Sequence, residues 1–359
     1  MNRKIDSVQT IVKSEGGKLL FHVDHKLGSC LHIACEVGDL DISCYLLKAA
    51  GIRLIGLEML DGRTCLHLAC REGHTHVVEM LLDIGGPVLL YKGIKSNGHT
   101  AVHIAAGTGK LDTVRMLIAA GGLATLSAVA KDGATPLFIA CQNGHTEVVA
   151  FILAATGRSA AAVMTLDGRT PLLAACAPGH SAVVHILLSA FDDNPAERTA
   201  LLMQRAAASA SGFAPLHAAC YAGHLDLVEV LLRVGGAAAL LLPTADGRTC
   251  LQLACARRHV AIAAMLLRHA ASQALLRLSV AADGCTPLHA AAYAGDAPLA
   301  RLLLSAGGAR LALQSAAAGH TCLHLASQEG HLEVRFARCS VGAPADAGSA
   351  NMFDLSVQD

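Results

Sequence analysis

The stretch Asp61-Gly62-Arg63-Thr64-Cys65-Leu66-His67-Leu68-Ala69-Cys70 decides the fold, because variants of it recur along the chain. Thr64 is a favourable helix N-cap, since its hydroxyl can accept a hydrogen bond from an amide of the first helical turn. Ahead of it, Asp61-Gly62 favours a turn, because Gly accepts a positive φ and Asp can bond its own backbone. The stretch therefore predicts a turn, a helix cap and a short helix that begins just after Thr64.

A second helix is expected directly after the first. Gly73 interrupts the first helix, and the mostly apolar run Val77-Val78-Glu79-Met80-Leu81-Leu82 follows at once. Gly85-Gly86 then predicts a left-handed C-cap. The structural unit is thus a turn, a helix, a turn, a helix and a glycine stop.

The cap position identifies nine copies of this unit. Successive caps lie 35 to 37 residues apart, except for an interval of 44 residues between Thr170 and Ala214. Such a constant period indicates a repeat solenoid, in which each unit packs on its neighbours. The caps are Ser29, Thr64, Thr100, Thr135, Thr170, Ala214, Thr249, Thr286 and Thr321.

These copies resemble the ankyrin repeat family, whose signature Thr-Pro-Leu-His-x-Ala is matched by Thr286-Pro287-Leu288-His289-Ala290-Ala291. The copies that begin at Thr64 and Thr321 differ only in having Cys for Pro. The resemblance covers Ser29 to about Val334. It implies an all-α repeat solenoid of stacked helix-turn-helix units joined by hairpin-like finger loops. The family's Gly-His step into the second helix recurs at Gly73-His74, Gly144-His145, Gly179-His180, Gly223-His224 and Gly330-His331.

Three segments follow from the repeat pattern. Residues 1–25 are expected to be an N-terminal partial or capping repeat, residues 26–339 an array of about nine repeats, and residues 340–359 a disordered tail. The long interval indicates an insertion near 191–211, with a turn at Asn194-Pro195 and a helix within 196–208. The period also exceeds the family's usual length of about 33 residues, so the fingers should be longer or carry a short extra helical turn.

The C-terminal end departs from the pattern. Arg335 and Arg338 stand where the earlier copy has Val228 and Leu231. Charges cannot be buried there without partners. The end is therefore either a polar capping helix, which repeat arrays need for solubility, or a truncated or altered repeat.

Composition argues against several partners and compartments. The 28 basic and 28 acidic residues balance, which gives no electrostatic basis for binding nucleic acid. The longest aliphatic patch, Ala237 to Leu242, is far shorter than a bilayer span, so no membrane insertion is expected. The 13 cysteines mostly follow the repeat, and no signal peptide is evident at the N-terminus. These features predict a monomeric cytoplasmic protein, with the nucleus also compatible.

The abundant histidines are better explained by packing than by metal binding. Equivalent residues in a stack lie one repeat apart and do not converge on one ion. No nucleophile elbow or phosphate-binding loop occurs, so we expect no metal, no cofactor and no enzymatic activity. The histidines at the signature position are His32, His67, His103, His217, His289 and His324, and those at the step into the second helix are His74, His145, His180, His224, His259 and His331.

Candidate binding residues are those that differ between copies at positions the family uses for partners, the fingers and the inner helices. They stand before the cap or after the first helix, and Tyr and Arg are frequent interface anchors. The seventh copy also replaces the inter-helix Gly by Arg258. The candidates are Arg63, Arg71, Glu72, Gln142, Asn143, Arg169, Phe213, Tyr221, Arg248, Arg257, Tyr293 and Gln328.

The resemblance implies a protein–protein interaction module, a scaffold or adaptor that binds partner proteins through its concave helix face and finger loops. One alternative is a substrate-recruiting part or fragment of a larger enzyme whose catalytic domain is absent from this chain. Another is an array without a specific partner.

Overall fold

The protein was studied as a computed structural model, which describes residues 3–15, 19–24, 26, 28–207, 211–269, 272–278, 280, 283–316 and 319–331. The chain divides into two compact units, Met1–Ala210 and Ser211–Asp359. The division follows the inserted segment. Among the described residues the secondary structure is helical apart from two isolated β-bridges, which confirms the all-α solenoid of helix-turn-helix repeats.

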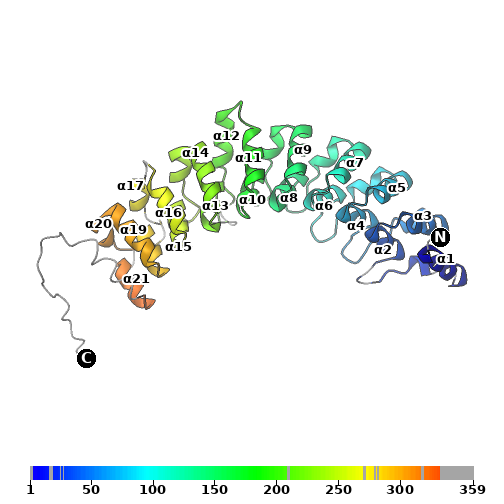
Figure 1. Ribbon diagram of the computed structural model, residues 1–359, viewed down its shortest axis with the longest axis horizontal. Helices are drawn as coiled ribbons and strands as arrows, with labels where there is room; N and C mark the ends of the chain where they lie inside the picture. Colours follow the sequence, from blue (N-terminus) through cyan, green and yellow to red (C-terminus); the bar gives the residue numbers. More distant parts are fainter. Residues whose placement is uncertain are drawn as a thin grey trace, which may run out of the picture. The chain divides into compact units, whose positions relative to one another are not determined.

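The first unit is a stack of helix pairs. Figure 1 shows its first helices in one row and its second helices in another. Each first helix packs on the next first helix in the stack. The first helices are α2 (Cys30–Val37), α4 (Cys65–Glu72), α6 (Ala101–Gly107), α8 (Pro136–Asn143) and α10 (Pro171–Cys176). The second helices are α3 (Leu40–Ala50), α5 (Thr75–Gly85), α7 (Leu111–Gly121), α9 (Thr146–Thr156) and α11 (Ser181–Ser189).

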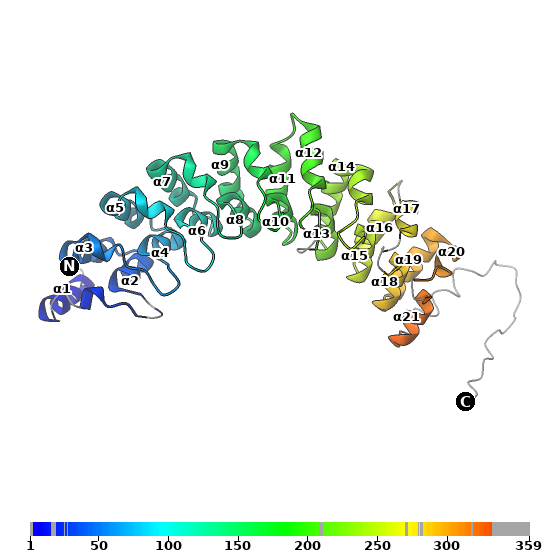
Figure 2. The ribbon, with the colours of Figure 1, turned by 180° about the vertical axis from the view of Figure 1, so that it is seen from behind.

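The second unit repeats this arrangement, and Figure 2 shows its helices from behind. The first helices are α13 (Pro215–Ala222), α15 (Cys250–Ala256), α18 (Pro287–Tyr293) and α21 (Cys322–Gln328). The second helices are α14 (Leu225–Leu241), α16 (Val260–Leu267) and α19 (Ala297–Gly307). Helix α14 contains a kink at Gly236, whose φ of 56° is not helical.

The residues added to the usual repeat length form short helical turns after the second helices, which confirms one of the two expectations for them. The glycine stop is also present, but its predicted left-handed helical cap is wrong. Gly86 has φ 71° and ψ 176°, an extended conformation with positive φ that glycine tolerates best. The added turns are η2 (Ile52–Leu54), η3 (Pro87–Tyr91), η4 (Leu123–Ser127), η5 (Arg158–Ala162), α17 (Ser272–Arg277) and α20 (Ala309–Ala312).

Helices also occur in the two irregular segments, the N-terminal segment and the insertion. Helix α1 (Arg3–Glu15) packs on α3 and on η1 (Leu19–Phe21). The inserted helix is α12 (Pro195–Met203), and the side chain of Asn194 accepts a hydrogen bond from Glu197 N at 3.2 Å. The C-terminal arginines and the predicted tail lie outside the described residues, so the role of that end stays a prediction.

Most of the repeated cysteines lie in the core, as expected for small buried apolar side chains, whereas Cys30 is half-buried. Cys35, Cys65 and Cys70 are completely shielded from solvent. Burial raises the pKa of the Cys70, Cys141 and Cys176 thiols well above the ordinary value. These thiols are therefore protonated and unreactive.

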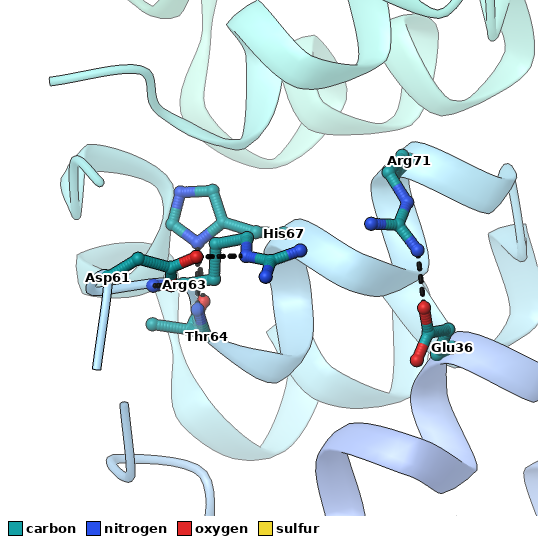
Figure 3. A network of polar contacts seen from close by, with 6 residues as sticks. All are labelled: Glu36, Asp61, Arg63, Thr64, His67 and Arg71. Atoms are coloured by element: carbon teal, nitrogen blue, oxygen red, sulfur yellow. Dashed lines mark hydrogen bonds and ion pairs between the residues drawn. The ribbon is translucent and has the colours of Figure 1, made fainter. Parts of the chain in front are cut away.

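The predicted caps start the first helices, but most of them bind differently from the expectation. The amide and hydroxyl of Thr64 lie 3.1 and 2.8 Å from Nδ1 of His67, so the ring takes the place of the first-turn amide (Figure 3). Where another residue stands at the histidine position, the expected bond forms. Thr135 Oγ1 accepts from Phe138 N, and Thr170 Oγ1 from Leu173 N, both at 3.2 Å.

The same histidine joins its repeat to the next one. Because Nδ1 of His67 accepts the Thr64 N–H, the proton is on Nε2, which donates to the His99 carbonyl at 3.2 Å. We call this arrangement the histidine bridge. Gln252 reproduces it, since its Oε1 accepts from Thr249 N at 2.7 Å and its Nε2 donates to Cys285 O at 2.8 Å. The equivalent carbonyl bonds join His103 to Ala134 and His289 to His320, whereas Nε2 of His217 donates to the Leu242 carbonyl directly after α14 of its own repeat.

The second set of histidines joins the repeats that carry them to the preceding ones. His74 Nε2 donates to the Glu36 carbonyl at 3.0 Å, and His145 Nε2 to the Gly107 carbonyl at 2.8 Å. The His74 ring also covers Gly38, where a Cβ atom would lie 2.5 Å from its Nδ1. Glycine is therefore required at this turn for two reasons. Its φ is +80°, and the His74 ring leaves no room for a Cβ atom.

Between the seventh and eighth copies, both members of this glycine–histidine pair are replaced. Arg258 keeps the positive φ, 63°, so the turn does not relax. The eighth copy has Asp296 where six other copies have His, and Arg258 Nε lies 3.5 Å from its Oδ2. The smaller Asp296 is compatible with the Cβ of Arg258, where a histidine ring would collide.

The histidine bridge predicts that acid destabilises the array. Burial lowers the pKa of His67 to about 4, from an ordinary value near 6.5. Between these values the unfolded chain binds a proton that the folded chain does not, so stability falls as pH falls from about 6.5 to 4. At about pH 5, the free energy of unfolding should be lower by roughly 2 kcal/mol because of this proton, and His67→Gln should abolish that decrease. Urea unfolding at pH 5 and pH 7.5 measures the difference.

Gln252 makes His67→Gln a matched replacement, because glutamine forms the bridge without titrating. At neutral pH it should stay within about 1 kcal/mol of the parent, whereas His67→Ala should lose about 2–4 kcal/mol by leaving buried polar groups unpaired. Equal acid sensitivity of the glutamine variant and the parent would contradict this account.

The left-handed turn at Arg258 predicts that glycine there is stabilising. A non-glycine residue at positive φ costs about 1–2 kcal/mol, and the long contact of the exposed guanidinium with Asp296 contributes little. Arg258→Gly should therefore raise the melting temperature by a few degrees, about 1 kcal/mol. As a control, Gly223→Ala should lower it, because a Cβ there would lie 2.6 Å from His259. No gain for Arg258→Gly would show that the turn is not strained.

Candidate functional site

The repeated polar residues do not form a metal or catalytic centre in the part of the chain that the structure describes. There, no three His, Cys, Asp or Glu side chains gather closely enough to hold an ion. Histidine Nε2 atoms such as those of His67 and His74 are directed at backbone carbonyls of neighbouring repeats. Within the same residues, no helix is both long and apolar enough to cross a bilayer.

Three predicted arginines before the caps form ion pairs within their own turns. Arg63 Nε lies 2.6 Å from the carboxylate of Asp61, and Figure 3 shows the two side chains together. Burial acts to raise the pKa of Asp61, but the hydrogen bonds from Arg63 outweigh it and hold that pKa below its ordinary value. Arg169 pairs in the same way with Asp167 at 2.6 Å, and Arg248 with Asp246 at 2.9 Å.

The predicted pair Arg71 and Glu72 is also satisfied within the first unit. Arg71 Nε lies 2.7 Å from Glu72, and its Nη2 reaches Glu36 on the neighbouring helix α2 (Figure 3). Asn143 Nδ2 donates to the Gly107 carbonyl at 2.7 Å, while Gln142 is exposed. In this unit the charged candidates are thus largely neutralised by neighbours.

The second unit brings three predicted residues together in one cluster, in which Phe213 is half-buried and the other two side chains are exposed. Phe213 precedes α13, Tyr221 lies near its end, and their rings meet edge to face at 5.6 Å between centroids. Arg257 follows α15 and places its guanidinium carbon 4.2 Å from the Tyr221 ring centroid. We call these three residues the Phe-Tyr-Arg cluster. Its residues come from two adjacent repeats and take no part in a histidine bridge.

Two further predicted residues line a cavity of about 410 Å³ in the second unit. Arg248 and Tyr293 contribute from adjacent repeats, and Ala256 is also part of the lining. Ala256 occupies the position that tyrosine has in the sixth and eighth copies. The small side chain leaves open the space that a third tyrosine would fill. Gln328, the remaining candidate, is exposed at the end of α21.

Sequence reasoning missed exposed apolar residues at the tips of fingers. Leu60 and Leu166 directly precede the aspartates of Asp-Gly turns, and they are 67% and 80% exposed. Other copies have Lys95, Lys131 or alanine near this point. Comparing the finger tips between copies would have found these two leucines, because an apolar residue there has no core to enter.

Comparison with known proteins agrees with the repeat architecture. The family described as "Ankyrin repeats (3 copies)" matches seven overlapping segments between residues 2 and 335. A solved structure, the human ASB11 ankyrin repeat domain, is 25% identical and has a TM-score of 0.52. The match covers 68% of this chain and 99% of that domain. No curated protein matches the sequence.

Proposed function

Because the chain belongs to the ankyrin repeat family, whose repeats are generally protein–protein interaction modules, we propose that it is a scaffold or adaptor. It binds partner proteins through the inner helices and fingers, and it carries no catalytic centre of its own. The proposal takes the protein to be monomeric and cytoplasmic or nuclear. Its buried, free cysteines are compatible with such reducing compartments.

The Phe-Tyr-Arg cluster is the observation that carries this proposal. Tyr and Arg dominate the energetic centres of interfaces, because they combine a large contact area with polar groups. In the first unit most candidate arginines are paired with carboxylates, whereas Arg257 contacts an aromatic ring and no carboxylate among the described residues. Tyr293 is 61% exposed beside the cavity. The second unit therefore offers the better binding surface.

The proposal predicts that a partner is lost when Tyr221 and Tyr293, on the first helices α13 and α18, are both truncated. Affinity capture with chemical crosslinking should retain a specific partner on the parent chain. Tyr221→Ala together with Tyr293→Ala should weaken its binding by about 2 kcal/mol or more, roughly thirtyfold. Titration of the captured partner against both chains measures this difference.

Tyr91→Ala is the matched control, because Tyr91 is 55% exposed on η3, after a second helix. It should leave binding unchanged. Loss of the partner with Tyr91→Ala alone would show that the binding surface lies near η3 and not on the first helices. Failure of the parent to retain any partner would contradict the scaffold function.

A further inference from the structure

The arginines around helix α15 keep unused hydrogen-bond donors. Arg248 meets Asp246 through Nε, and Arg258 meets Asp296 through Nε. Arg257 contacts the Tyr221 ring. Within the described residues, no hydrogen bond or ion pair engages the Nη groups of these three side chains. The outer edges of three guanidinium groups thus remain available to an external acceptor.

The carboxylates nearby are already engaged by donors of the protein. Asp296 is buried, and its Oδ1 accepts from Leu299 N at 3.0 Å. Asp283 lines the cavity, and its Oδ1 accepts from Cys285 N at 2.9 Å. Asp246 contacts Arg248 through Oδ2, and its Oδ1 accepts from the Thr244 hydroxyl. The surface accordingly presents more free donors than free acceptors.

We infer that this surface of the second unit binds an acidic, extended peptide segment along α15, with carboxylates at Arg248 and Arg257 and an apolar or aromatic side chain in the cavity. The inference rests on the proposed function and names the chemistry of the partner. A planar guanidinium edge binds a carboxylate through two parallel hydrogen bonds, which adds specificity as well as affinity. The Phe-Tyr-Arg cluster orients Arg257 for this contact.

The distance between the two arginines restricts the peptide. Arg248 precedes and Arg257 follows α15, a helix of 7 residues, which is about 10 Å long. An extended chain advances about 3.3 Å per residue. The two acidic residues should therefore lie about three or four positions apart, and a residue between them is placed to reach the cavity beside Tyr293 and Leu325.

A phage-displayed library of random peptides, selected on the purified chain, tests this inference. The selected peptides should be enriched in pairs of Asp or Glu three or four residues apart, with an apolar or aromatic residue between them. Arg248→Gln with Arg257→Gln should reduce the binding of these peptides at least about tenfold, because charge-assisted contacts are lost.

The matched control is Arg233→Gln with Arg301→Gln, which removes the same charge from the second helices α14 and α19. It should leave peptide binding unchanged, and thermal melting should show that both double variants fold. Equal loss in the control, selected peptides without acidic pairs, or no selected peptide would each overturn the inference. In those cases a partner retained by crosslinking and lost with Tyr221→Ala and Tyr293→Ala would leave the scaffold function standing.

Discussion

The histidine bridge is the buried polar interaction that fixes one repeat on the next at several points of the array. One neutral imidazole satisfies the cap of its own repeat through Nδ1 and the backbone of the next repeat through Nε2, as His67 does between Thr64 and His99. Both partners are buried backbone groups that would be costly to leave unpaired. Where it forms, the bridge therefore couples the start of a first helix to the finger of the next repeat and helps set their spacing. It forms at His67, His103, Gln252 and His289.

This coupling explains why repeated and variable positions differ in what they can do. A repeated residue has a neighbour above and below, so a change on one side alters the contact on the other. Arg258 and Asp296 illustrate the point, because the loss of the glycine in one copy accompanies the loss of the histidine in the next. Residues outside these contacts, such as Tyr221 and Arg257, are free to vary and to meet a partner.

The helix starts, glycine turns and buried cysteines were predictable because each depends on a few neighbouring residues. Other features depend on contacts between copies and were not. The sequence indicated that Thr64 caps a helix, but not that its hydroxyl meets His67. It ranked Arg71 and Arg257 as equal candidates. Only the fold shows that Arg71 is neutralised by Glu36 and Glu72, while Arg257 stacks on Tyr221.

The central claim is that histidine bridges join neighbouring repeats and that the variable residues on the first helices of the second unit bind a partner protein. Hydrogen-exchange mass spectrometry of the full chain, alone and saturated with its captured partner, tests it most directly. Partner binding should protect amides around Tyr221, Arg257 and Tyr293 and leave exchange in the second helices α14, α16 and α19 unchanged. New protection confined to those second helices, with none on the inner face, would contradict the account.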